Sequence, residues 1–370
     1  MAILQFFYCF VLMNCDSLFA FKKIEKAESM ITVEANTGRV LYSENETKRL
    51  PMASTTKIIT AIVAIENSKN LDIKYEMPKE AVGIEGSSIY LKAGEKLSIR
   101  ELLYGLMLRS GNDSAVAIAI IVGGSLENFV QMMNEFCGHL NLKDTNIVTV
   151  NGLHDDNHYT TASDLAKITC YALKNKTFAE IVSTKEKNIS AEKNKEGYRF
   201  LKNKNKLLKM VDGADGVKTG YTTKAGKCFV GSATRNDMRV VCVVLNAPNM
   251  FDECARLIEK VFQEYSMRVL LKKGEITQTE IKNNKEFQKI PVILKQDIKY
   301  PLTREEMKNV VAEVKIIDNL SAPILDSQEI GMIEIKIENN LIFSEKIYTI
   351  NIEKYKEKNF IKNIIERLFK

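Results

Sequence analysis

The stretch that decides the fold is residues 51–64, which read Pro51-Met52-Ala53-Ser54-Thr55-Thr56-Lys57-Ile58-Ile59-Thr60-Ala61-Ile62-Val63-Ala64. It predicts an apolar helix that begins with a serine and a lysine three positions apart, and residues at that spacing face the same way. A serine hydroxyl becomes a good nucleophile when a base lies within hydrogen-bond reach. Lysine serves as that base when burial or a neighbouring cation disfavours its charged form. The apolar surroundings of Lys57 favour this interpretation over an N-cap serine followed by a surface lysine.

A second motif, Ser110-Gly111-Asn112, falls between two apolar helical segments. Ser110 would pass protons between Lys57 and a leaving amine. Asn112 carries donors and an acceptor that suit a substrate amide. Taken alone, the motif is better explained as a plain turn between two helices with an N-cap.

A third motif, Lys218-Thr219-Gly220, begins a predicted strand. Lys218 and the hydroxyl of Thr219 would bind a substrate carboxylate, and Gly220 would let the backbone approach closely. Lys218 would also be the cation that lowers the pKa of Lys57, provided that its strand lies beside the helix of Ser54. The alternative is an ordinary lysine at a sheet edge.

The order of the three motifs carries the inference, because short patterns of this kind recur by chance. A second Ser-x-x-Lys occurs at Ser190–Lys193, and Ser-x-Asn recurs at Ser43–Asn45 and Ser68–Asn70, whereas Lys-Thr-Gly occurs once. As a set, the motifs describe acyl transfer by a serine that uses lysine in place of histidine.

The hydrophobic periodicity predicts a mixed α/β (α+β) domain over residues 28–268. We expect a hairpin at 30–42, helices at 54–67, 98–108, 113–122, 126–140, 163–173 and 251–265, and strands at 217–225, 227–234 and 239–245. Ser98 and Glu101 form a capping box, and Ser163 is the expected N-cap of its helix. The first and the late strands are expected to share one antiparallel sheet.

Two further segments follow this domain. Residues 269–352 alternate polar and apolar residues between turn signals and predict a small all-β domain. Residues 355–370 predict an amphipathic helix with one apolar face, made of Phe360, Ile361, Ile364, Ile365, Leu368 and Phe369. Such a helix can lie in a membrane interface, and the alternative is a helix packed on its own domain.

The N-terminal residues 1–20 are interpreted as a signal peptide, although no lysine or arginine precedes the apolar run. That run, Ile3–Cys15, is shorter than the roughly 20 residues that a spanning helix needs. Together with the amphipathic tail, it predicts an exported protein at the extracytoplasmic face of the cell membrane. Cleavage after Ala20 would leave five cysteines, an odd number that argues against a full disulfide framework but leaves one disulfide possible.

The charge pattern disfavours nucleic-acid binding. The chain has 53 basic and 47 acidic residues for a net charge of +6, and the two signs are interspersed. The cysteine spacing contains no metal pattern, and the three histidines do not form the His-Glu-x-x-His motif of zinc peptidases. We therefore expect no metal and no cofactor.

The motifs stand in longer stretches that resemble the D-alanyl-D-alanine carboxypeptidases, the low-molecular-mass penicillin-binding proteins. The stretches are Pro51-Met52-Ala53-Ser54-Thr55-Thr56-Lys57, Leu108-Arg109-Ser110-Gly111-Asn112-Asp113-Ser114-Ala115, Asn151-Gly152-Leu153, His158-Tyr159-Thr160-Thr161-Ala162-Ser163-Asp164-Leu165, Asp215-Gly216-Val217-Lys218-Thr219-Gly220-Tyr221-Thr222 and Lys224-Ala225-Gly226. The similarity is strong over residues 28–268. Residues 322–324 and 330–331 resemble the family's C-terminal β domain more loosely, and a terminal amphipathic helix is also a family feature.

The resemblance implies a β-lactamase/transpeptidase-like fold and a role for each motif residue. Ser54 would form the acyl-enzyme with Lys57 as base, Ser110 would relay protons, Asn112 would hold the substrate amide, Lys218 and Thr219 would bind the terminal carboxylate, and the backbone N–H groups of Ser54 and Tyr221 would form the oxyanion hole beside Gly220. The reaction would release D-alanine from peptidoglycan stem pentapeptides, and β-lactam antibiotics would acylate the same serine.

One departure from the family pattern concerns the carboxylate. Many relatives carry an arginine just before the late helix, where this chain has Asn249-Met250-Phe251-Asp252. The alternatives are a β-lactamase-like hydrolase, although no Glu-x-x-Leu-Asn signature occurs, and a catalytically weak protein that binds wall material or senses β-lactams.

Overall fold

The computed structural model describes residues 26–191, 196–274, 277–283, 286–317 and 325–350. The expected signal peptide at 1–20 and the amphipathic helix at 355–370 lie outside these residues. Among the described residues, no single helix has both the length and the apolar character needed to cross a membrane. The helices α3 (Asn112–Gly123) and α4 (Leu126–His139) meet both criteria only when taken together, and they form a pair bent by 86°.

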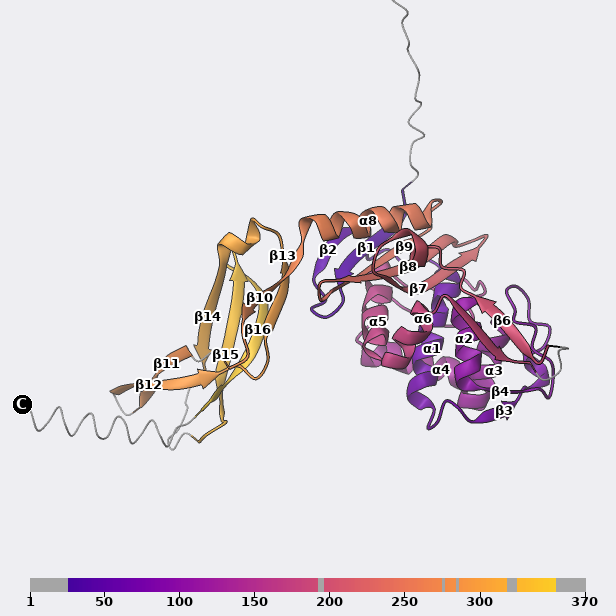
Figure 1. Ribbon diagram of the computed structural model, residues 1–370, viewed down its shortest axis with the longest axis horizontal. Helices are drawn as coiled ribbons and strands as arrows, with labels where there is room; N and C mark the ends of the chain where they lie inside the picture. The colour runs from indigo at the N-terminus through magenta and orange to yellow at the C-terminus, as the bar shows by residue number, and fades with distance from the viewer. Residues whose placement is uncertain (1–25, 192–195, 275–276, 284–285, 318–324, 351–370) are drawn as a thin grey trace, which may run out of the picture.

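A five-stranded antiparallel sheet forms the centre of the first domain, in the order β2-β1-β9-β8-β7 (Figure 1). Its strands are β1 (Ser29–Glu34), β2 (Val40–Glu44), β7 (Ala214–Thr222), β8 (Gly226–Arg235) and β9 (Met238–Leu245). Thr32 of β1 lies opposite Cys242 of β9, so the first and last strands share the sheet as the sequence predicts.

The central strand β9 is apolar on both faces, because helices cover both faces of the sheet. Val241, Val243 and Leu245 pack on the helical cluster, whereas their neighbours Val240 and Val244 pack under α8 (Met250–Glu264). Figure 1 shows α8 on one side of the sheet and the helical cluster of α1 to α6 on the other. The alternation of period two along a strand thus distributes one apolar run between two cores.

The helical cluster is built mostly from apolar helices. It contains α1 (Lys57–Asn67), α2 (Ile99–Leu108), α3 (Asn112–Gly123), α4 (Leu126–His139), α5 (Ala162–Lys174) and α6 (Lys176–Ser183), and a short helix α7 (Leu207–Met210) precedes β7. The capping box of Ser98 and Glu101 is present at the start of α2. The expected N-cap of α5 is wrong: Thr161, whose backbone is extended, accepts the hydrogen bond of the Asp164 N–H at 3.0 Å, and Ser163 lies within the first turn.

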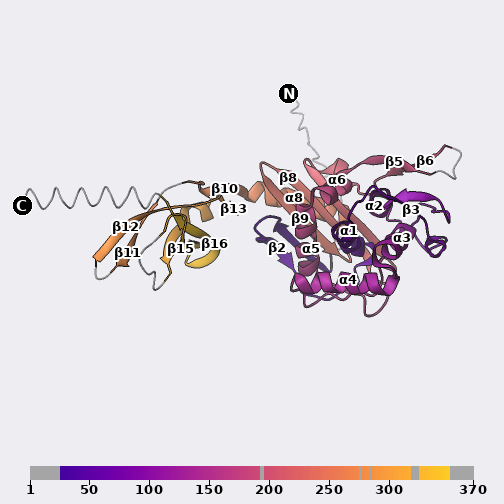
Figure 2. The same cartoon turned by 90° about the horizontal axis from the view of Figure 1, so that it is seen from below.

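Two small two-stranded sheets lie beside the cluster, near α2 (Figure 2). β3 (Lys74–Glu76) pairs with β4 (Lys96–Ser98), and β5 (Glu186–Ser190) pairs with β6 (Tyr198–Lys202). Single 3₁₀ turns occur at Ala53–Thr56, Lys79–Ala81 and Glu306–Asn309. Ser54 therefore lies in a 3₁₀ turn directly before α1 and not in the α-helix itself, which the sequence predicted to start at this serine.

The second part of the chain is β-rich, as expected. β10 (Ser266–Leu271) pairs with β13 (Ile298–Leu302), and a five-stranded sheet has the order β11-β12-β16-β15-β14. The strands of that sheet are β11 (Thr277–Asn283), β12 (Glu286–Ile293), β14 (Val310–Ile316), β15 (Glu329–Ile337) and β16 (Asn340–Thr349). The guanidinium of Arg39 connects the two parts, because it lies 5.2 Å from the ring centres of both Tyr265 and Tyr300 and forms an ion pair with Glu306.

Candidate active site

Ser54 and Lys57 form a hydrogen-bonded pair where the 3₁₀ turn passes into α1. Lys57 Nζ lies 2.9 Å from Ser54 Oγ. The lysine side chain is fully buried, while Ser54 is half-buried and therefore reachable by a substrate. Ala53 holds the turn in a left-handed conformation with φ +48°. The pair has the geometry of a nucleophile and its base.

The other two contacts of Lys57 Nζ are both carbonyl oxygens. One is Oδ1 of Asn112 at 2.7 Å, and the other is the backbone oxygen of Asn151 at 2.5 Å. A carbonyl oxygen can only accept, so these contacts take the two hydrogens of a neutral amine. In the neutral amine, the remaining lone pair of Nζ would then face Ser54 Oγ and could accept the hydroxyl proton.

The electrostatics around Lys57 favour that neutral amine. Burial lowers the pKa of Lys57 well below its ordinary value, and the charge of Lys218 lowers it further. Lys204 acts in the same direction, whereas Asp113 opposes it. Burial also lowers the pKa of Lys218 to about 7, with a second contribution from Lys204. The charges of Lys218 and Lys204 therefore both favour the neutral form of Lys57.

The link between α2 and α3 positions Asn112, the first residue of α3, at the site. The backbone N–H of Asn112 donates to the Ser87 carbonyl at 2.7 Å, and its side-chain Nδ2 donates to the Glu85 carbonyl at 2.6 Å. Ser110 is buried in the same link, in a left-handed conformation with φ +64°. Ser110 and Lys57, both in the described part of the chain, share no direct hydrogen bond.

Strand β7 passes directly beside the serine turn. A Cβ added at Gly220 would meet the backbone nitrogens of Ser54 and Thr55 at 3.1 Å, so this close approach favours glycine. Lys218 is buried and its Nζ donates to the Thr219 carbonyl at 2.8 Å. Tyr221, the next residue of β7, has an exposed side chain. The N–H groups of the expected oxyanion hole thus come from two adjacent segments.

Lys204 is a third lysine at the site that the sequence analysis did not single out. Its Nζ donates to the hydroxyl of Ser87 at 3.1 Å. Burial lowers the pKa of Lys204, and Arg109 lowers it further. A lone lysine in a lysine-rich chain has no distinguishing pattern, so only the fold could show that it belongs to the site.

The sequence motifs also do not reveal the roles of the Asn151 carbonyl and the Asp113 carboxylate, for different reasons. The Asn151 carbonyl contacts Lys57, yet a backbone acceptor leaves no mark in a side-chain motif. The carboxylate of Asp113 accepts from the N–H groups of Ile89 and Leu91, which fixes the loop that holds Asn112. Its position directly after the Ser-Gly-Asn motif is the one signal that could have pointed to it.

The second Ser-x-x-Lys match does not join the site. Ser190 lies at the end of β5, where its hydroxyl accepts from Lys74 Nζ at 3.1 Å.

All five cysteines among the described residues are buried and free. No group of three His, Cys, Asp or Glu side chains that could hold a metal occurs in the described part of the chain.

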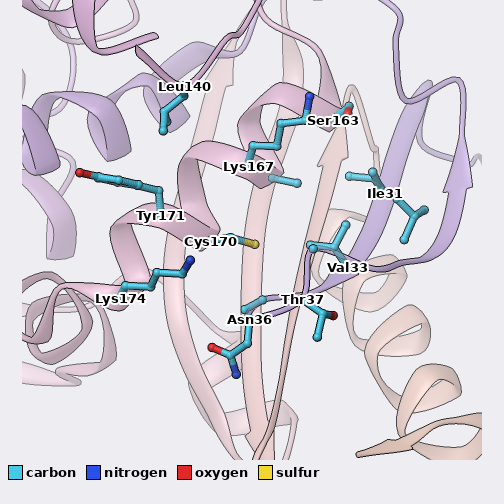
Figure 3. A pocket seen from close by; sticks show the side chains of 14 residues that line it. Ile31, Val33, Asn36, Thr37, Leu140, Ser163, Lys167, Cys170, Tyr171 and Lys174 are labelled. Carbon is cyan, nitrogen blue, oxygen red and sulfur yellow. The ribbon is translucent and has the colours of Figure 1, made fainter. Parts of the chain in front are cut away.

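A separate cavity of about 310 Å³ lies between the β1–β2 hairpin and α5 (Figure 3). Its walls are mainly apolar, with Val33 on one side and Cys170 on the other, and Lys167 and Lys174 come from the same helix. Burial raises the pKa of the Cys170 thiol to about 12, which makes it a poor nucleophile. None of the predicted catalytic residues, all of which the structure describes, lines this cavity.

The sequence model of a known family, described as D-alanyl-D-alanine carboxypeptidase, matches residues 20–249. The chain belongs to this family. A second family model, the C-terminal domain of penicillin-binding protein 5, matches residues 265–354. Membership identifies the enzyme as a serine peptidase, and its mixed α/β fold with a C-terminal β domain is that of its structural relatives.

Individual carboxypeptidases match most of the chain. D-alanyl-D-alanine carboxypeptidase DacF of Bacillus subtilis is 34% identical over 326 residues, which cover 86% of this chain and 83% of the relative. DacA of Escherichia coli is 30% identical over 355 residues, covering 92% and 86%. The crystal structure of penicillin-binding protein 5 from Haemophilus influenzae superimposes with a TM-score of 0.75 at 27% identity, covering 88% of this chain and 97% of that one.

Proposed function

We propose that this serine-type D-Ala-D-Ala carboxypeptidase removes the terminal D-alanine from peptidoglycan stem pentapeptides through an acyl-enzyme on Ser54. One observation carries the proposal: Lys57 Nζ lies 2.9 Å from Ser54 Oγ, and its other two contacts are carbonyl oxygens. These contacts orient the lone pair of the neutral amine toward the hydroxyl proton. The lowered pKa of Lys57, caused first by burial, keeps the amine available as a base.

Acylation would begin with proton transfer from Ser54. The hydroxyl proton of Ser54 moves to Lys57 Nζ while Oγ bonds to the carbonyl carbon of the penultimate D-alanine. The carbonyl oxygen gains negative charge and accepts the N–H groups of Ser54 and Tyr221. The C–N bond breaks, the nitrogen of the terminal D-alanine receives the proton from Lys57 by way of Ser110, and free D-alanine leaves.

Deacylation returns the enzyme to its starting state. A water molecule gives a proton to Lys57 and its oxygen bonds to the ester carbon. The ester C–O bond breaks, Ser54 Oγ regains a proton, and the tetrapeptide leaves with a new carboxylate. A β-lactam acylates Ser54 by the same first step, but its opened ring stays attached and no leaving group departs.

The substrate carboxylate would be bound by cations from two elements. Lys218 and the hydroxyl of Thr219 come from β7, and Asn112 holds the neighbouring amide. Many relatives carry an arginine just before α8, and this chain does not. We propose that Lys204 binds the substrate carboxylate in its place. Its charge already acts on both Lys57 and Lys218, so its side chain lies close enough to influence an anion bound there.

The test is release of D-alanine from a peptide that ends in D-Ala-D-Ala, measured with the chain lacking residues 1–20. We expect steady release by the wild type and none by Ser54→Ala. Release by the alanine variant would refute the role of Ser54. Fluorescent penicillin provides a second readout: stable label on Ser54 is expected, whereas rapid loss of label would favour the β-lactamase-like alternative.

We further propose that residues 1–20 export the protein and that residues 355–370 hold it at the outer face of the membrane. The support is the sequence pattern of both segments. Deletion of residues 355–370 should abolish binding to anionic vesicles and leave D-alanine release from a soluble peptide unchanged. Equal vesicle binding with and without the segment would disprove the anchor.

A further inference from the structure

His158 is buried between the two backbone segments that hold the Ser54–Lys57 pair. On one side, its Nε2 lies 2.8 Å from the hydroxyl oxygen of Thr56, in the serine turn. On the other side, its Nδ1 accepts from the N–H groups of Val148 at 3.0 Å and Thr149 at 3.3 Å. The imidazole therefore connects the 3₁₀ turn with residues 148–151.

The hydrogen-bond partners fix where the protons lie. Nδ1 faces two N–H donors, so it carries no hydrogen, and the hydrogen of the neutral ring lies on Nε2. The Thr56 hydroxyl donates to the Ala53 carbonyl at 2.7 Å, which leaves its oxygen free to accept from His158. The bonds thus run in one direction, from His158 through Thr56 to Ala53, the residue before the nucleophile.

Residues 148–152 also contact the base of the reaction. The Val150 carbonyl accepts from the hydroxyl of Thr60 at 2.6 Å, and the next carbonyl, that of Asn151, accepts from Lys57 Nζ. Gly152 follows so closely that an added Cβ would come within 2.0 Å of the Ala53 carbonyl oxygen. A shift of this segment would move the carbonyl that orients Lys57.

We propose that His158 is a positioning residue for the Ser54–Lys57 pair, holding the serine turn against residues 148–151 so that the Asn151 carbonyl stays on Lys57. The inference rests on the proposed function of Ser54 and extends it to a residue that touches neither substrate nor the reacting atoms. A misplacement of about 1 Å in such a site can slow a reaction about 100-fold.

Burial keeps His158 neutral, as this role requires. Burial lowers the pKa of His158 to about 4. Asp155 raises this pKa slightly, and His154 and Lys57 lower it. A proton on Nδ1 would face the N–H groups of Val148 and Thr149 and would break the connection.

The experiment measures the rate of acylation by fluorescent penicillin in variants of the protein. Thr56→Val removes the connection at nearly constant side-chain volume, and His158→Phe removes it with a somewhat larger ring. Both are expected to slow acylation about 10- to 100-fold. Because they interrupt the same chain of hydrogen bonds, the double variant should be no slower than the slower single variant. His158→Gln retains a donor and an acceptor and should recover most of the rate.

His154→Gln is the matched control, because His154 belongs to the same loop but is exposed and pairs with the exposed Asp156. Its rate should equal that of the wild type, and thermal unfolding checks that every variant folds. Wild-type rates in both Thr56→Val and His158→Phe, or losses that multiply in the double variant, would overturn the role of His158. A wild type that takes no label, like Ser54→Ala, would instead overturn the proposed function itself.

Discussion

Arg199 offers the clearest test of how the fold supports the site. Its guanidinium, on β6, donates to both carboxylate oxygens of Glu95 at 2.8 and 2.7 Å. It also donates to the carbonyls of Ile89, Tyr90 and Ser190 at 2.9, 2.9 and 3.1 Å. The side chains of Arg199 and Glu95 are 7% and 1% exposed, so the pair is buried.

Replacing Arg199 with methionine would leave the Glu95 carboxylate buried without its cation. Removing one partner of a buried ion pair costs about 3–5 kcal/mol. For a domain of roughly 150–250 residues, each kcal/mol lowers Tm by about 2–4 °C, so Arg199→Met should lower Tm by about 6–20 °C. Glu95→Leu combined with Arg199→Met removes both charges and should recover a large part of this loss.

The same substitution should also slow acylation. The carbonyls of Ile89 and Tyr90 belong to the loop that supplies the carbonyls of Glu85 and Ser87 to Asn112. A loop released from Arg199 holds Asn112 less firmly against Lys57. Thermal unfolding by circular dichroism and the rate of fluorescent penicillin labelling measure the two effects.

Arg199→Lys is the matched control, because it keeps the charge but loses the bidentate contact. Its Tm should fall between those of the wild type and Arg199→Met. A decrease of less than about 2 °C for Arg199→Met would show that the buried-charge reasoning is wrong. A double variant less stable than the single one would lead to the same conclusion.

Four other predictions follow from described contacts. The folded-state pKa of His158 is about 4 against an ordinary 6.5, so the unfolded chain binds more protons between these values. Stability should therefore fall by about 3 kcal/mol as the pH drops from 6.5 to 4, and urea titrations of His158→Gln should lack this component. Gly220→Ala should slow acylation at least about 10-fold, with little change in Tm, because its methyl group meets the Ser54 N–H; an unchanged rate would contradict the close approach. Lys204→Ala should raise KM for a D-Ala-D-Ala peptide about 10-fold while Lys204→Arg preserves it, and equal KM values would exclude Lys204 from the carboxylate site. Because the pKa of Lys218 is about 7, KM should rise as the pH increases above 7 and the cation is lost; a KM that is flat from pH 6 to 9 would rule this out.

The side-chain motifs could be located from the sequence because their residue types and order are unusual together. The structure brings Ser54, Lys57, Asn112 and β7 into one site, as that order predicts. The Asn151 carbonyl could not be found in this way, because every residue has a carbonyl and only the fold selects one. Thr161 and Ser163 are both good N-cap residues, and the choice between them depends on which backbone is extended.

The hairpin of β5 and β6 was missed because its pattern is not that of a buried strand. Glu186, Lys187 and Asn188 are consecutive exposed polar residues, and one inward side chain, Ile189, gives too short an alternation. The hairpin is nevertheless what brings Arg199 to Glu95. Hydrophobic periodicity thus does not predict a surface strand such as β5, although its hairpin supports the site.

The apolar character of β9 on both faces has a consequence for how the sheet finds its alignment. A slip by one residue would exchange Val240 and Val244 with Val241 and Val243, so side-chain chemistry hardly distinguishes the two registers. The turn between β8 and β9 has to make the distinction. Its two residues, Asn236 and Asp237, have φ +47° and +64°, as a type I′ turn requires, and pair Arg235 with Met238. Two polar residues at one end of β8 and β9 therefore set the register of these strands. The neighbouring strand β7 lies beside the serine turn at the opposite end of the same sheet.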